Sequence, residues 1–147
     1  MFSVFYPNVQ IDSIYSIICE AKKQKHGTIL LITNKETATS ETKRLKRYNR
    51  ALGISPTNLF DNNNSIQALT SIDGAVIIDL DGMCYSIGVI VDGDAIAVGK
   101  TARGSRYNST VNYILRRSKE KQLIFGIVIS EDETTDIITP KGDIVKI

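Results

Sequence analysis

Three short runs of apolar residues constrain the fold of this chain most strongly. They cover residues 28–33, 75–79 and 123–129, and polar or glycine-containing segments bound them. A strand with apolar side chains at nearly every position suits a sheet that is covered on both faces. The runs therefore predict an α/β fold in which helices pack on a central sheet.

Two segments have the periodicity of helices that bury one stripe. Residues 11–24 form the first, with Asp12 as its predicted N-cap and Gly27 as its end. Residues 105–119 form the second, with basic residues near its C-terminal end. The predicted buried stripes consist of Ile11, Ile14, Tyr15, Ile18 and Ala21 in the first helix and Val111, Ile114 and Leu115 in the second.

The remaining segments complete a mixed sheet with parallel and antiparallel strands. The polar stretch up to Gly53 is interpreted as an amphipathic surface helix or an irregular connection, and residues 65–70 as a short helix. Glycine-containing turns predict further strands. Those strands are 85–91, 95–98, 135–139 and 144–147, with turns at Asp81-Gly82, Asp92-Gly93 and Lys141-Gly142.

Length and charge narrow the class of protein. The 147 residues fit one domain, and we expect an N-terminal helical segment, 1–26, ahead of one globular unit, 27–147. A net charge of +2 is too small to predict binding to nucleic acid or to a membrane. No apolar run reaches bilayer length and the N-terminus lacks signal-peptide features, so we expect a cytoplasmic protein. Cys19 and Cys84 lie in apolar patterns and are predicted to be buried, reduced thiols.

Three short strings carry residue types suited to phosphate chemistry. The first offers a carboxylate and a glycine before a buried strand. The second offers a glycine, a hydroxyl and an arginine where a helix begins, and helix N-termini favour phosphate groups. The third places a hydroxyl and a carboxylate after a later strand. Each string alone also fits an ordinary turn or a capped helix. They are Asp73-Gly74-Ala75, Gly104-Ser105-Arg106 and Ser130-Glu131.

A segment at 93–101 has the appearance of a Walker A loop but departs from that motif. The place of its first glycine is held by Asp94, and the intervening residues have the pattern of a strand. We therefore interpret this segment as a strand that ends in a turn.

From about Gly27 to its C-terminus the chain resembles the diadenylate cyclase domain, also called the DisA N-terminal nucleotide-binding domain. The family has a DGA motif before a buried strand, a GTRHR string about thirty residues later, and a Ser-Glu pair after another strand. Here the corresponding strings occur in the same order. The resemblance implies a mixed-sheet α/β fold and the condensation of two ATP molecules into cyclic di-AMP, a bacterial signalling nucleotide, with release of pyrophosphate. It also implies Mg²⁺ or Mn²⁺ and a homodimer, or higher homo-oligomer, whose active sites face each other.

The resemblance also implies roles for individual residues. Asp73 and Arg106 would be catalytic, and Asp73 and Glu131 would bind the metal. The other expected contacts to ATP, or to another nucleoside triphosphate, come from Gly74, Ala75, Arg103, Gly104, Ser105, Tyr107, Asn108, Ser130 and Glu131.

Two positions depart from the family pattern. Tyr107 stands in place of the family's histidine, and Asn108 in place of its second arginine. Losing a charge-assisted phosphate contact costs about 1.5–3 kcal/mol, which Arg103 beside the string could restore. The alternative functions are a catalytically inactive nucleotide sensor and a module that binds no nucleotide.

Overall fold

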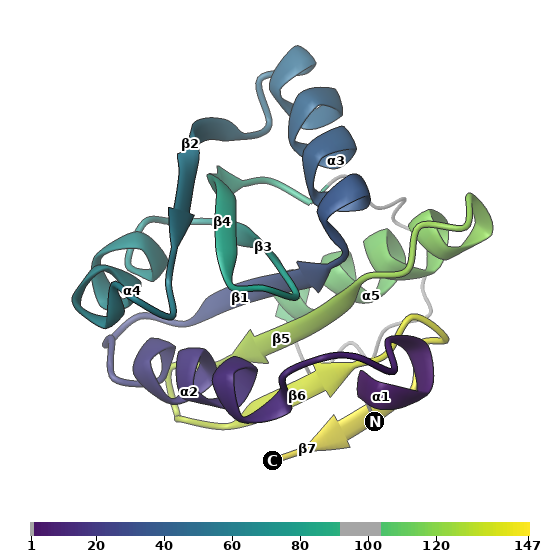
Figure 1. Cartoon of the computed structure of the whole chain (residues 1–147). Helices are drawn as coiled ribbons and strands as arrows, with labels where there is room; N and C mark the ends of the chain where they lie inside the picture. The colour runs from purple at the N-terminus through teal and green to yellow at the C-terminus, as the bar shows by residue number, and fades with distance from the viewer. Residues whose placement is uncertain (1, 92–103) are drawn as a thin grey trace.

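The computed structural model describes residues 2–91 and 104–147, and for residues 104–106 it describes the backbone alone. Its helices and strands alternate along most of the chain (Figure 1). The helices are α1 (Phe2–Phe5), α2 (Ile11–Ala21), α3 (Lys35–Arg47), α4 (Asn63–Thr70) and α5 (Gly104–Lys119). The strands are β1 (Thr28–Thr33), β2 (Leu52–Asn58), β3 (Ala75–Asp79), β4 (Met83–Val89), β5 (Phe125–Ile129), β6 (Thr135–Ile138) and β7 (Ile144–Lys146).

The described strands form one seven-stranded mixed sheet in the order β2-β4-β3-β1-β5-β6-β7. Strands β1 and β3 are parallel, and the other neighbouring pairs are antiparallel. The prediction of one α/β domain with a mixed sheet is therefore confirmed.

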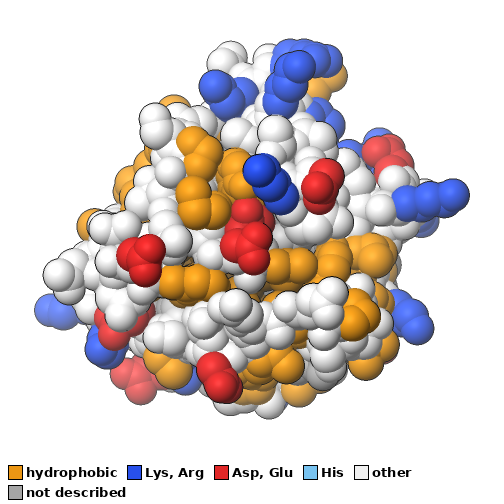
Figure 2. Space-filling view, viewed as in Figure 1, with side chains coloured by type: hydrophobic (Ala, Val, Ile, Leu, Met, Phe, Trp, Pro, Cys, Tyr) orange, Lys and Arg blue, Asp and Glu red, His pale blue; other side chains and the backbone are white. Residues whose placement is uncertain are grey.

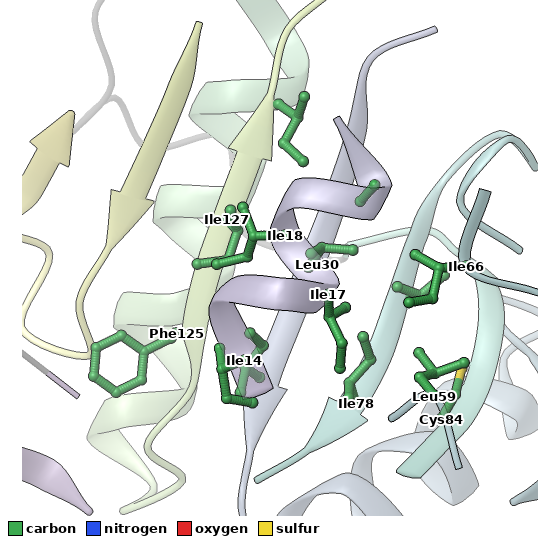
Figure 3. Packing of buried hydrophobic residues seen from close by; sticks show 14 of the residues in the cluster. Ile14, Ile17, Ile18, Leu30, Leu59, Ile66, Ile78, Cys84, Phe125 and Ile127 are labelled. Atoms are coloured by element: carbon green, nitrogen blue, oxygen red, sulfur yellow. The ribbon is translucent and has the colours of Figure 1, made fainter. Parts of the chain in front are cut away.

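Alternating side chains of the central strands enter two hydrophobic cores. Leu30 and Ile32 of β1 belong to the core beneath α1, α2 and α4, whereas Ile29 and Leu31 belong to the core beneath α3 and α5. Figure 3 shows α2 directing its isoleucines onto the first of these faces. All the residues of β1, β3 and β5 are buried, as expected for strands with helices on both sides.

The hairpin between β3 and β4 is fixed by the carboxylate of Asp79, which is 2% exposed. Its Oδ1 accepts hydrogen bonds from the backbone N–H groups of Asp81 (2.8 Å) and Met83 (3.0 Å). Its Oδ2 accepts one from the Tyr85 hydroxyl at 2.7 Å. Burial, and then this hydrogen bond, raise the pKa of Tyr85. Gly82 has a φ of 81°, which confirms the turn predicted at Asp81-Gly82.

A buried ionic network joins α3 to α5. The Glu41 carboxylate is 1% exposed and accepts two hydrogen bonds from Arg44, at 2.8 and 2.9 Å. It accepts a third from the Tyr113 hydroxyl at 2.7 Å, and Arg117 Nη1 lies 3.7 Å from its Oε2. Three side chains, those of Arg44, Tyr113 and Arg117, therefore offset the cost of burying this charge.

Several sequence expectations need correction. The N-cap of α2 is Gln10, and Asp12 lies in the first turn, where a negative charge favours the helix dipole. The helix ends at Ala21, well before Gly27. Cys84 is buried as expected, but Cys19 is exposed on α2. The strand expected at 95–98 lies outside the described residues.

The polar segment before Gly53 is divided differently from our prediction. Helix α3 ends at Arg47, and Asn49 then adopts a φ of 57°. The chain enters edge strand β2 at Leu52, so Gly53 lies within a strand and does not end a helix. Strand β2 was not predicted because most of its residues are exposed and it contains Pro56, a residue type typical of sheet edges.

Candidate functional site

The first and third strings lie at one edge of the sheet. Because β1 and β3 are parallel, both begin at this edge, and antiparallel β5 ends there. The pairing is explicit, since Ile29 is opposite Ala75 and Thr28 is opposite Ile129. Two strand spacings of about 4.8 Å separate the start of β3 from the end of β5, roughly 10 Å in all.

Asp73 and Gly74 immediately precede β3. Asp73 is exposed, and the Ala75 side chain is buried in the core beneath α3 and α5. Gly74 has a φ of 108°, and a Cβ added there would meet Gly88 C at 2.8 Å and Val89 O at 2.9 Å. The group that approaches Gly74 is therefore the backbone of β4. This contact holds the loop that carries Asp73 against the neighbouring strand.

Helix α5 packs on β5 and is joined to it by the short segment 120–124, so the helix returns along the strand in the opposite direction and its first turn points to the same edge. A Cβ at Gly126 would meet Thr110 Cγ2 at 2.9 Å and Ile114 Cδ1 at 2.6 Å, which fixes the level at which the helix crosses the strand. From that level the helix extends back to Gly104 over about 12 Å, and β5 extends to its end over about 10 Å. The backbone of the second string therefore begins near the level at which the first and third strings lie.

The structure describes the backbone of the second string but not all of its side chains. Gly104, Ser105 and Arg106 form the first turn of α5, so Ser105 lies inside the helix and does not cap it. The side chain of Arg106 and all of Arg103, together with the Walker-like segment, lie outside the described residues. The roles assigned to those side chains remain predictions.

The two divergent residues occupy different environments. Tyr107 is 3% exposed and packs in the core that contains Ala75 and Val128. Asn108 is partly buried, and its buried Oδ1 has no hydrogen-bond partner among the described residues. An unpaired buried oxygen in the first two turns of α5 leaves one polar group there that needs a donor or a cation.

The third string belongs to a well-formed turn between β5 and β6. Ser130 N donates to Thr134 O at 2.9 Å, and Glu133, with a φ of 70°, donates from its backbone to Ser130 O at 3.0 Å. Hydrogen bonds from the Thr134 hydroxyl and backbone lower the pKa of Asp132 and tie the turn together. Glu131 is exposed on this turn, so its carboxylate faces solvent at the same edge as Asp73.

The described residues can be compared with the needs of a divalent metal. They contain no cluster of three His, Cys, Asp or Glu side chains that could hold a metal ion unaided. Mg²⁺ is commonly bound by one or two carboxylates together with water and substrate phosphates. The exposed carboxylates of Asp73 and Glu131 suit binding of Mg²⁺ together with water and substrate phosphates.

A pocket that the sequence analysis did not predict adjoins the third string. It has a volume of about 440 Å³ and lies between residues 22–25, after α2, and the β5–β6 turn. Ser130, Glu131 and Glu133 line it on the strand side. The only sequence signal was a run of lysines beside His26, which is more typical of a solvated loop.

Structural comparison finds solved structures that share the fold of this chain. A cysteine double mutant of DacA from Staphylococcus aureus, a diadenylate cyclase, aligns with a TM-score of 0.63 at 15% identity, over 92% of this chain and 84% of that one. A hypothetical membrane-spanning protein from Bacillus cereus aligns with a TM-score of 0.66 at 18% identity, over 97% of this chain and 65% of that one. These likenesses show a shared fold. No protein-family model and no curated protein sequence matches the chain.

Within residues 2–91 and 104–147, none of the helices combines the length and the apolar character that crossing a bilayer requires.

Proposed function

We propose that the chain is a nucleotidyltransferase of the diadenylate cyclase type, which condenses two ATP molecules into cyclic di-AMP or a related cyclic dinucleotide. The observation that carries the proposal is that the first and third strings lie at one sheet edge, toward which the first turn of α5 is also directed. The first and third strings are more than fifty residues apart in the sequence, and they come together because β1 pairs with both β3 and β5. The fold shared with DacA supports the same assignment.

The chemistry would be an in-line displacement at phosphorus. The 3′-hydroxyl of one nucleotide attacks the α-phosphorus of the other, pyrophosphate leaves, and a second transfer closes the ring. Asp73 would accept the hydroxyl proton, while the first turn of α5 and Arg106 would hold phosphate oxygens. Mg²⁺ or Mn²⁺ held by Asp73 and Glu131 would supply charge neutralisation when bound. Two copies of the chain would face each other, each with one ATP.

The direct test is incubation of the purified protein with ATP and Mn²⁺, with the product identified by mass spectrometry. We expect cyclic di-AMP from the wild type and at least a hundredfold lower rate from Asp73→Asn. Asp61→Asn is the matched control, because Asp61 is an exposed aspartate that follows β2 near the opposite edge of the sheet. The absence of a cyclic product from every nucleoside triphosphate, alone or mixed, would refute the proposal.

A nucleotide sensor that lacks catalytic activity is the second candidate. The burial of Tyr107 in the core favours it, because the residue at the family's histidine position then contributes packing. Tight binding of a nucleotide without turnover, unchanged in Asp73→Asn, would establish this alternative.

A further inference from the structure

The pocket beside the β5–β6 turn has a mixed lining of charged groups. One wall consists of the consecutive residues 22–25, which include three lysines, and the other contains Ser130, Glu131 and Glu133. Basic and acidic side chains lie close together at the lower left of Figure 2, on the side of the molecule where Figure 1 shows the end of α2. Its volume of about 440 Å³ falls within the range of small-molecule sites.

Two of the lysines are available to a ligand. Lys23 Nζ forms an ion pair with Glu20 Oε1 at 2.7 Å. Lys22 and Lys25 form no ion pair within the described part of the chain, although both line the pocket. An ammonium group is a compact charge with several hydrogen-bond donors, which suits the oxygens of a phosphate.

Gln24 adds a donor whose direction is fixed. Its Oε1 accepts a hydrogen bond from His26 N at 2.7 Å, which determines the orientation of the amide. The Nε2 atom is buried and has no partner among the residues that the structure describes. A buried N–H group is costly to leave unpaired, so this amide is suited to an acceptor oxygen from a ligand.

We propose that this pocket binds pyrophosphate, the leaving group of the reaction proposed above, and the inference rests on that function. Lys22, Lys25 and Gln24 would donate to its oxygens. The carboxylates of Glu131 and Glu133 would face the divalent cation that accompanies pyrophosphate. Because Ser130 and Glu131 also belong to the candidate nucleotide site, the two sites share a wall.

Isothermal titration calorimetry with inorganic pyrophosphate and Mg²⁺ tests the pocket without relying on turnover. Gln24→Glu keeps the acceptor for His26 N but replaces the donor by an oxygen, and Lys22→Ala/Lys25→Ala removes both free ammonium groups. Each variant is expected to bind pyrophosphate about tenfold to a hundredfold more weakly. Lys43→Ala is the control, because Lys43 is an exposed lysine on α3, which packs on the other face of the sheet, and its affinity should equal that of the wild type.

The outcomes separate this inference from the proposed function. If the wild type makes a cyclic dinucleotide while all the variants bind pyrophosphate equally, the inference is wrong and the function stands. If no nucleotide is cyclised but the pocket variants alone lose pyrophosphate affinity, the site is supported and the cyclase function fails. Unchanged thermal unfolding midpoints would show that any loss of affinity does not come from misfolding.

Discussion

Three glycines offer a graded test of how the Asp73 loop is held. Gly74 combines a φ of 108° with a close approach to the β4 backbone. Gly88 has a φ of 59°, but an added Cβ would have its nearest neighbour at 3.7 Å. Gly53 has no positive φ, and an added Cβ would meet only the flexible side chain of Lys46. Alanine at these positions therefore separates the cost of a strained backbone conformation from the cost of a steric clash with the β4 backbone.

The expected losses of unfolding free energy follow from these geometries. Gly88→Ala should cost about 1–2 kcal/mol, because an L-residue is strained in the left-handed region. Gly74→Ala adds an overpacking cost of about 1–3 kcal/mol, because strand backbone must move, which gives a total of about 2–5 kcal/mol. Gly53→Ala should lie within about 0.5 kcal/mol of the wild type, since the Lys46 side chain can move and alanine suits a strand better than glycine.

Urea denaturation followed by circular dichroism measures all three variants. For a slope of about 2 kcal/mol/M, a loss of 3 kcal/mol lowers the midpoint by about 1.5 M. Gly74→Ala should have the lowest midpoint and Gly53→Ala the highest. Equal midpoints for Gly74→Ala and Gly88→Ala would refute the argument that the β4 backbone requires a glycine at position 74.

Two further predictions concern buried groups. Glu41→Ala should lower the unfolding free energy by about 3–5 kcal/mol, because the Arg117 side chain is 6% exposed and loses a buried counter-charge. Glu120→Gln, at a side chain that is 61% exposed, should cost about 0–1 kcal/mol. A larger loss for Glu120→Gln than for Glu41→Ala in urea denaturation would contradict this prediction. Burial raises the pKa of Cys84 to about 12. Native protein at pH 8 should therefore react with one equivalent of a thiol reagent, at Cys19, whereas unfolded protein should react with two. Two equivalents consumed by the native protein would contradict the burial of Cys84.

The central sheet could be predicted because burial on both faces leaves a clear pattern. Residues 28–33 and 75–79 are apolar at nearly every position, and the structure has β1 and β3 at these bounds. Edge strand β2 leaves no such pattern, since solvent covers most of its residues and Pro56 interrupts it. The N-cap of α2 was misassigned for a related reason: the actual N-cap, Gln10, makes no side-chain capping bond, whereas aspartate, as at position 12, is a residue type typical of caps.

The candidate site shows a different limit of sequence reasoning. Asp73 and Ser130 could be selected from their residue types, but their proximity depends on β1 pairing with both β3 and β5, which is a tertiary choice. Lys22 and Lys25 belong to a run of lysines that is more typical of a solvated loop than of a binding site. They line a pocket only because the end of α2 lies opposite the β5–β6 turn, and no spacing along the chain encodes that contact.

The pairing of β1 with two neighbours has an evolutionary consequence. The ends of β3 and β5 are positioned by main-chain hydrogen bonds and by the burial of apolar side chains, and neither of these depends on one particular side chain. Apart from residues such as Gly74, whose contact with β4 requires a glycine, the loops at this edge are therefore anchored by the strands beneath them. Substitutions there can alter which ligand is held, or whether it reacts, while the sheet beneath them stays the same. Such an edge allows a lineage to gain or lose a chemical activity without refolding.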